Sequence, residues 1–336
     1  MRTIRSNKLK SRLLLSLPLA LLAATPLFAQ TYVVGRTVDG QPDLQGLWTN
    51  DTITPIERPA SMEGRAFLSE DEIASMEAGL AERREFSDNN IVVEVGGNIG
   101  GYNQIWLDSG DTVLSTGQTS MIVEPANGRA PIREEAAARR DYGFANVENH
   151  YVNHTVWDRC ITRGVPGSML PAGYNNAYRF IQTEDSFTII HEMIHDVRVI
   201  PLKKDTHIDS KVKLWMGDSV AHWEGDTLII NTRNWYHEYN LRGMSKQAVV
   251  EERIRRLDDT TLEYDFTVND PLSWDESWSA KFPLRESADP IYEYACHEGN
   301  HGLVGILAGW RYQEALGNNG DGSPLSATGV VETEEN

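Results

Sequence analysis

Long apolar segments are missing from this chain after residue 24, and without one no helix can span a membrane. Basic residues are also scarce, since 31 Lys and Arg stand against 49 Asp and Glu, for a formal net charge of −18. So acidic a chain is a poor partner for nucleic acid or an anionic membrane surface. The sequence has no G-x-S-x-G, no P-loop and no G-x-G-x-x-G after an expected strand, which excludes the common hydrolase and nucleotide-binding templates.

Cysteine is limited to two residues, Cys160 and Cys296. In an oxidising compartment, an even pair this far apart predicts a disulfide rather than a nucleophile or a metal site. The chain-entropy estimate for closing a loop of this length is on the order of 4 to 5 kcal/mol. A reactive thiol is the alternative, although neither cysteine lies in a distinctive local motif.

The first 29 residues are typical of a secretory signal peptide. Basic residues precede an apolar run from Leu13 to Ala24, and Ala29 offers a cleavage point. Removing this segment takes away five positive charges and no negative ones, so the net charge becomes −23. We therefore expect a periplasmic or secreted bacterial protein with no membrane span, and the sequence leaves its oligomeric state open.

From residue 119 onward, the pattern is mostly strands joined by tight turns. Residues 183–186 predict a hairpin turn between two apolar segments. The clearest alternation of apolar and polar residues places four side chains on one face: Leu262, Tyr264, Phe266 and Val268. Successive hairpins with few helices between them predict a mainly β fold, an antiparallel meander forming a lipocalin-like barrel with long loops.

We expect the barrel domain to cover residues 119–316. Residues 30–118 would supply extended segments and a helix that begins at a capping box of Ser69 and Glu72, packed on the barrel. A second helix is expected across residues 132–140. The composition of residues 317–336, rich in Gly, Asn, Ser, Thr and Glu, predicts a disordered tail.

The letters HExxH occur at residues 191–195, where a zinc protease would need a helix to place both histidines on one face. Seven of the fourteen residues from Phe187 to Ile200 are β-branched, which predicts a strand instead. On a strand, His191 and His195 would share one face and Glu192 the other. A zinc hydrolase through these three residues is therefore only a third interpretation, and we expect no metal.

Several polar side chains nevertheless suit acid-base chemistry, because they combine groups of different pKa. The candidate catalytic residues are His195, Glu192, Asp196, Tyr174, His297 and Glu298. Aromatic rings and amides that could hold a substrate lie near them or after a glycine loop. The candidate substrate-binding residues are Tyr102, Asn103, Trp106, Asn175, Asn176 and Arg198.

Six motifs spread over the mature chain resemble a widespread family of exported bacterial proteins to which no activity is assigned. They are PDLQGLWT at 42–49, YN at 102–103, YNN at 174–176, EMIHDVR at 192–198, WEGDTL at 223–228 and YEYACHEGN at 292–300. The resemblance implies that EMxHDxR is the motif and that HExxH arises from one additional residue, His191. The chain departs from the family pattern at Gln118, at residues 220–222 and at His301, which puts a shared substrate in doubt.

Our leading hypothesis is an exported enzyme that uses acid-base chemistry without a cofactor on a small or oligomeric organic substrate in the barrel cavity. A lyase or isomerase is favoured over a hydrolase. The alternative is a periplasmic lipocalin-like binding protein for an apolar or aromatic ligand. The enzyme hypothesis requires that Tyr174, Glu192, His195 and His297 converge on one cavity.

Overall fold

The computed structural model describes residues 32–89, 107–204, 206–236 and 243–318. The expected signal peptide and most of the expected tail lie outside the described residues, as do Tyr102, Asn103 and Trp106. From Val34 onward the chain forms one structural unit.

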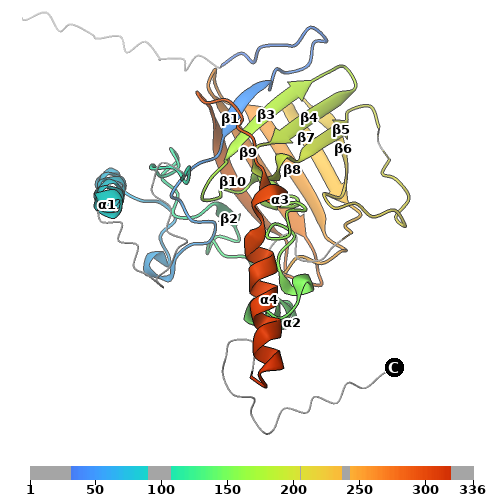
Figure 1. The fold of residues 1–336 in the computed structure, drawn as a ribbon. Helices are drawn as coiled ribbons and strands as arrows, with labels where there is room; N and C mark the ends of the chain where they lie inside the picture. The colour runs from blue at the N-terminus through green and yellow to red at the C-terminus, as the bar shows by residue number, and fades with distance from the viewer. Residues whose placement is uncertain (1–31, 90–106, 205, 237–242, 319–336) are drawn as a thin grey trace, which may run out of the picture. The chain divides into compact units, whose positions relative to one another are not determined.

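In the described residues, ten antiparallel strands form one sheet, and nine of them follow each other in the order β5-β4-β3-β1-β10-β9-β8-β7-β6 (Figure 1). Three-residue β2, Ile122–Glu124, pairs with β10 outside this series. The nine strands are β1 Gly46–Thr49, β3 Ala177–Gln182, β4 Ser186–His191, β5 Val197–Pro201, β6 Asp218–Glu224, β7 Thr227–Arg233, β8 Val249–Arg256, β9 Thr261–Asn269 and β10 Trp278–Glu286.

The short strand β1 joins two groups of hairpins that are separate in sequence. Trp48 lies opposite Tyr178 of β3 on one side and opposite Glu286 of β10 on the other. The hairpins β3-β4-β5 and β6 to β10 thus become one continuous sheet. The predicted hairpin turn at residues 183–186 connects β3 to β4, as expected.

The two end strands, β5 and β6, come into contact and nearly close the sheet into a barrel (Figure 1). In the described part of the chain no backbone ladder joins them. Arg198 on β5 instead reaches across the gap and donates to the Ser219 hydroxyl on β6. The predicted mainly β, antiparallel barrel is therefore confirmed, with one unpaired seam.

Side chains from all nine strands fill the barrel interior, because alternate residues along each strand point inward. On β9 the predicted inward set of Leu262, Tyr264, Phe266 and Val268 is fully buried. Phe180 and Phe187 meet edge to face across the β3-β4 hairpin, with ring centroids 5.2 Å apart. The interior is thus a packed core, and a ligand pocket has to be sought in the wall or at the ends.

Helices lie outside the sheet. Helix α1, Glu70–Asn89, begins at the predicted capping box, where Ser69 N–H donates to the Glu72 carboxylate at 2.9 Å. Helix α2, Glu134–Ala145, corresponds to the second helix expected at residues 132–140, but it begins and ends later. The remaining helical segments are α3 Cys296–Gly299, α4 His301–Ala315 and the 3-10 turns η1 Ala60–Met62, η3 Tyr151–Asn153, η4 Gly167–Met169 and η5 Met193–His195.

Helix α4 is an unpredicted element, and several of its apolar side chains are exposed. No residue of this fully described helix is buried, and Val304 is 69% exposed. Asn300 caps the helix by accepting a hydrogen bond from Leu303 N–H at 3.3 Å. Among the described helices, none is both long enough and apolar enough to cross a bilayer.

Candidate functional site

The segment that carries the HExxH letters is a hairpin turn, and not the single strand that the composition predicts. Strand β4 ends at His191, β5 begins at Val197, and Met193–His195 forms a 3-10 turn between them. Ile194 and His195 adopt positive φ values of 62° and 45°. The predicted division of faces is therefore wrong, since His191 and Arg198 both point into the barrel while His195 is exposed.

The structure contradicts the helix on which the zinc-hydrolase interpretation depends. His191 is buried against Tyr178, and burial lowers the pKa of its imidazole to about 3. His195 is directed elsewhere, with Nδ1 2.9 Å from the carbonyl oxygen of Tyr294. Across the described residues, no group of three His, Cys, Asp or Glu side chains is arranged to hold a metal ion.

Glu192 is buried and has its carboxylate occupied by backbone amides. It accepts from Tyr292 N–H at 3.0 Å and from Ala177 N–H at 3.2 Å, while its own N–H donates to the Ala177 carbonyl. These contacts tie the β4-β5 turn to the start of β3 and to the segment before α3. Its oxygens are therefore committed to structural hydrogen bonds.

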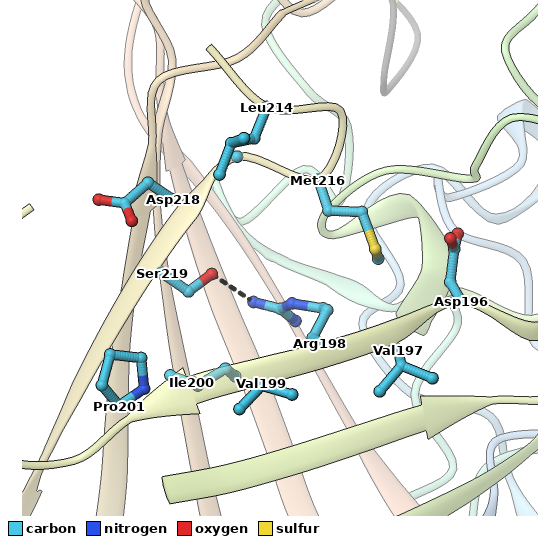
Figure 2. Close-up of a pocket in the computed structure, with 11 residues that line it drawn as sticks. Asp196, Val197, Arg198, Val199, Ile200, Pro201, Leu214, Met216, Asp218 and Ser219 are labelled. Carbon is cyan, nitrogen blue, oxygen red and sulfur yellow. Dashed lines mark hydrogen bonds between the residues drawn. The ribbon is translucent and has the colours of Figure 1, made fainter. Parts of the chain in front are cut away.

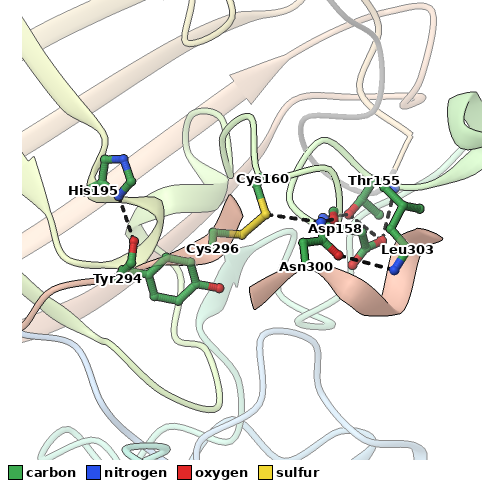
Figure 3. Close-up of a disulfide and its surroundings, with 8 residues drawn as sticks. All are labelled: Thr155, Asp158, Cys160, His195, Tyr294, Cys296, Asn300 and Leu303. Carbon is green, nitrogen blue, oxygen red and sulfur yellow. Dashed lines mark hydrogen bonds between the residues drawn. A yellow bond between two sulfur atoms is a disulfide. The ribbon is translucent and has the colours of Figure 1, made fainter. Parts of the chain in front are cut away.

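The predicted disulfide between Cys160 and Cys296 is confirmed, with a Cα–Cα distance of 5.7 Å (Figure 3). Beside it, the Asn300 amide donates to the Asp158 carbonyl at 3.0 Å and contacts the Cys160 sulfur. The bridge and these bonds fasten the segment that runs from β10 to α4 to the loop around Cys160.

The enzyme hypothesis requires Tyr174, Glu192, His195 and His297 to converge on one cavity. Three of them contact the segment between β10 and α3. The Tyr174 ring stacks on Tyr294 with centroids 6.2 Å apart, while His195 contacts the Tyr294 carbonyl and Glu192 accepts from Tyr292. They gather around a strip of chain, and none of them lines the pocket between β5 and β6 that is described below. His297 lies exposed on α3, next to the equally exposed Glu298.

The two predicted asparagines form a turn. Asn175 adopts a positive φ of 55°, and the buried Asn176 side chain accepts from Ala172 N–H and donates to the Ala172 carbonyl. Asn176 N–H also donates to the Asp108 carboxylate at 3.1 Å. These bonds shape the entry to β3 and occupy the side-chain amide of Asn176, which a substrate would need.

A pocket of about 370 Å³ lies at the unpaired seam of the barrel (Figure 2). It contains two of the predicted site residues, Asp196 and Arg198. The segment before β6 supplies the opposite wall, which the sequence analysis missed. The complete lining is Asp196, Val197, Arg198, Val199, Ile200, Pro201, Leu214, Met216, Gly217, Asp218 and Ser219.

Arg198 links this pocket to a buried ion pair. Its Nη1 and Nη2 donate to the two oxygens of Glu252 at 3.0 and 2.7 Å, and Tyr264 O–H donates to Glu252 at 2.9 Å. The side chains of Arg198 and Glu252 are 3% and 0% exposed. Paired donors of this kind fix the guanidinium as well as neutralising it.

Two carboxyl groups stand at the ends of the pocket. Asp196 accepts from the Thr162 hydroxyl at 2.6 Å, and burial raises the pKa of its carboxyl group. Asp218 accepts from Ile208 N–H at 2.9 Å and lies 2.7 Å from His207 Nδ1. The site therefore combines an apolar wall with one paired cation and two acidic groups.

Neither a protein-family model nor a curated protein matches the chain. Among solved structures, a secretory abundant heat soluble (SAHS) protein from Ramazzottius varieornatus is similar over 39% of this chain and 86% of its own, with 12% identity and a TM-score of 0.24. Similarity this weak says nothing about function. The barrel assignment rests on the strand order and register of the chain itself.

Proposed function

We propose that this chain is an exported, lipocalin-like binding protein that holds an apolar or aromatic small molecule in the pocket between β5 and β6. The observation that supports this function is the position of the pocket. It lies in the wall, at the seam without a backbone ladder, while side chains occupy the barrel interior. A ligand there can reach buried surface without displacing the core.

The pocket wall exposes comparable polar and apolar surface, and its apolar part suits an apolar ligand. Ile200, Leu214 and Met216 provide aliphatic and thioether surface, and a methionine adapts its shape easily to a ligand. Val199, which is 66% exposed, extends this surface to the outside. The volume of about 370 Å³ falls at the lower end of the range for small-molecule sites.

Binding of the neutral fluorescent probe N-phenyl-1-naphthylamine tests this function. Leu214→Trp fills the pocket from a partly exposed position, whereas Val212→Trp adds the same ring two residues away, outside the lining. We expect Leu214→Trp to weaken probe binding by about tenfold or more, because steric overlap of this kind typically costs about 1–3 kcal/mol. Equal affinity in both variants, or no binding by the unaltered protein, would refute the proposal.

Acid-base catalysis in the same pocket is the second candidate, and one observation favours it. Asp196 lines the pocket, its carboxyl group has a raised pKa, and it directly follows the exposed His195. In this case, a compound retained on purification would be converted during incubation. Asp196→Asn would abolish conversion and preserve binding. A compound that stays unchanged over time would exclude the enzyme.

A further inference from the structure

We propose that Arg163 and the aromatic rings beside it form a second binding site, which takes a small carboxylate with an aromatic body. The two carboxylate oxygens would accept hydrogen bonds from Nε–H and Nη2–H of Arg163. The rings of Trp157, Tyr174 and Tyr294 would contact the body of the ligand. None of these four residues lines the pocket between β5 and β6, so the site goes beyond the proposed function.

The first argument is a pair of accessible donors on one edge of Arg163. Its Nη1 donates to the Leu170 carbonyl at 3.0 Å, which holds the side chain in place. Among the described residues Nε and Nη2 have no acceptor, and neither atom is closed off from solvent. Nε–H and Nη2–H leave the same edge of the guanidinium side by side, at the spacing of the two oxygens of a carboxylate.

The second argument is charge. In the part of the chain that the structure describes, the Arg163 guanidinium has no carboxylate partner, although 49 Asp and Glu outnumber 31 Lys and Arg in the sequence. Burial lowers the pKa of this guanidinium, and the groups that oppose the decrease are the side chains of Tyr178, Tyr174 and Tyr294. A bound anion would therefore balance a partly buried charge that the fold leaves unbalanced.

The third argument is a row of aromatic rings that begins at Arg163. Its Cζ lies 5.2 Å from the centroid of the Trp157 ring. The Tyr174 ring follows at 6.4 Å from Trp157, and Tyr294 stacks on Tyr174 at 6.2 Å. Figure 3 shows the carbonyl of Tyr294 directed at His195 while its ring extends away. All four side chains of the site are partly exposed, so the rings can contact a planar ligand.

The surroundings favour a ligand with a single negative charge. Asp196 accepts from the hydroxyl of Thr162, which directly precedes Arg163. Glu192 accepts from Tyr292 N–H in the segment that carries the last ring of the row. In a chain with a net charge of −18, such acidic neighbours oppose a dianion more strongly than a monoanion. A carboxylate therefore suits the site better than a phosphate group.

Three matched naphthalene compounds test the ligand class by calorimetry: 2-naphthoate, the neutral 2-naphthamide and 2-naphthyl phosphate. We expect 2-naphthoate to bind about 10 to 100 times more tightly than the amide, as for hydrogen bonds between charged groups. The phosphate should bind more weakly than the carboxylate. Equal affinities for carboxylate and amide would overturn the proposal, and a preferred phosphate would overturn the assigned ligand class.

Substitutions of Arg163 test the position of the site. Arg163→Gln should weaken 2-naphthoate binding about 10 to 100 times, and Arg163→Lys should restore only part of it, because an ammonium group lacks the paired edge. Arg159 supplies the control, since it lies in the same loop with its Cζ 5.3 Å from the centroid of the Tyr151 ring. Arg159→Gln should leave the affinity unchanged. Equal losses in the two glutamine variants would refute a specific site at Arg163.

A spectroscopic measurement on the unaltered protein keeps the inference testable even if Arg163 variants fail to fold. In a ¹H–¹⁵N spectrum of the arginine side chains, 2-naphthoate should shift one Nε–H signal and 2-naphthamide should not. Trp157→Phe changes the ring that faces Arg163, so a shift of the same signal in the free variant identifies it. A 2-naphthoate complex without any such shift would contradict the assigned contact.

The two proposed sites fail independently of each other. Leu214→Trp should weaken the binding of N-phenyl-1-naphthylamine and leave that of 2-naphthoate unchanged, because Leu214 lines only the pocket between β5 and β6. If Leu214→Trp blocks 2-naphthoate as well, the carboxylate occupies that pocket and the second site is wrong. If 2-naphthoate binds through Arg163 and the neutral probe does not bind at all, only the proposed function fails.

Discussion

The buried pair of Arg198 and Glu252 should be the most sensitive point of the barrel wall. Burial lowers the pKa of the Arg198 guanidinium, but attraction and hydrogen bonding from Glu252 outweigh burial and raise it overall. Glu252→Gln keeps the shape of the side chain and one oxygen that can accept from Tyr264, but it removes the charge and replaces the second acceptor of Arg198 by an NH2 group. Because an unpaired cation would stay inside, we expect the free energy of unfolding to fall by about 3–5 kcal/mol.

Removing both charges should cost much less. The variant Arg198→Met with Glu252→Leu removes both charges of this pair, although Tyr264 O–H loses its acceptor. We expect its stability to lie within about 2 kcal/mol of the unaltered protein, since apolar replacements of buried pairs are often neutral or better. The exposed pair of Lys203 and Glu184 supplies the control. Glu184→Gln should cost less than about 1 kcal/mol.

Urea unfolding, followed in parallel by tryptophan fluorescence and circular dichroism, measures these differences where the two transitions coincide. A cost for Glu252→Gln no larger than that for Glu184→Gln would show that water enters the seam and solvates Arg198. The reasoning would also fail if the double variant were as unstable as the single one, because the cost would then come from shape and not from charge.

Three further predictions follow from single residues. The imidazole of His191 has a pKa of about 3 in the folded protein and near 6.5 in the unfolded chain. Between these two pH values only the unfolded chain binds a proton at His191, so the free energy of unfolding falls as the pH drops below about 6.5. Between pH 7.5 and 5, the unaltered protein should lose about 2 kcal/mol more in urea titrations than His191→Gln, and equal losses would contradict this. Glu192→Gln should cost about 1–3 kcal/mol and speed amide exchange at Tyr292, because one of two backbone donors loses its acceptor; unchanged exchange would refute the contact. Gly305→Ala, at a position with nothing within 4 Å of an added Cβ, should raise helix content by circular dichroism, as alanine favours a helix by about 1 kcal/mol over glycine. A loss of helix there would indicate that another molecule covers α4.

Local patterns predicted the parts of the barrel that neighbouring residues determine. The alternation on β9, the hairpin between β3 and β4 and the capping box of α1 each involve residues close in sequence. The position of β1 could not be predicted in this way. Trp48 pairs with Tyr178 and with Glu286, which lie more than a hundred residues away, and four residues carry too little pattern to identify such partners.

The turn at residues 192–196 escaped prediction for a different reason. Turns with positive φ usually contain Gly or Asn, whereas Ile194 adopts φ 62° here despite its branched side chain. Side chains alternate between the two faces only along a continuous strand. Because the turn interrupts the strand, His191 and Arg198 lie on the same face and not on opposite faces as expected. The pocket was missed with it, since Leu214, Met216 and Ser219 face β5 only after the barrel has nearly closed.

The apolar pattern of β5 does not by itself decide which face points inward. Arg198 and Ile200 are buried, whereas Val197 and Val199 are exposed. A slip of one residue would bury the two valines and expose Arg198 and Ile200, and hydrophobic burial alone would accept it because two apolar side chains replace one. The pair with Glu252 opposes this slip, because only the observed register brings the guanidinium to its carboxylate. We therefore expect the double variant, although stable, to show faster amide exchange along β5 than the unaltered protein. Equal protection in both would mean that the ladder to β4 alone fixes the register.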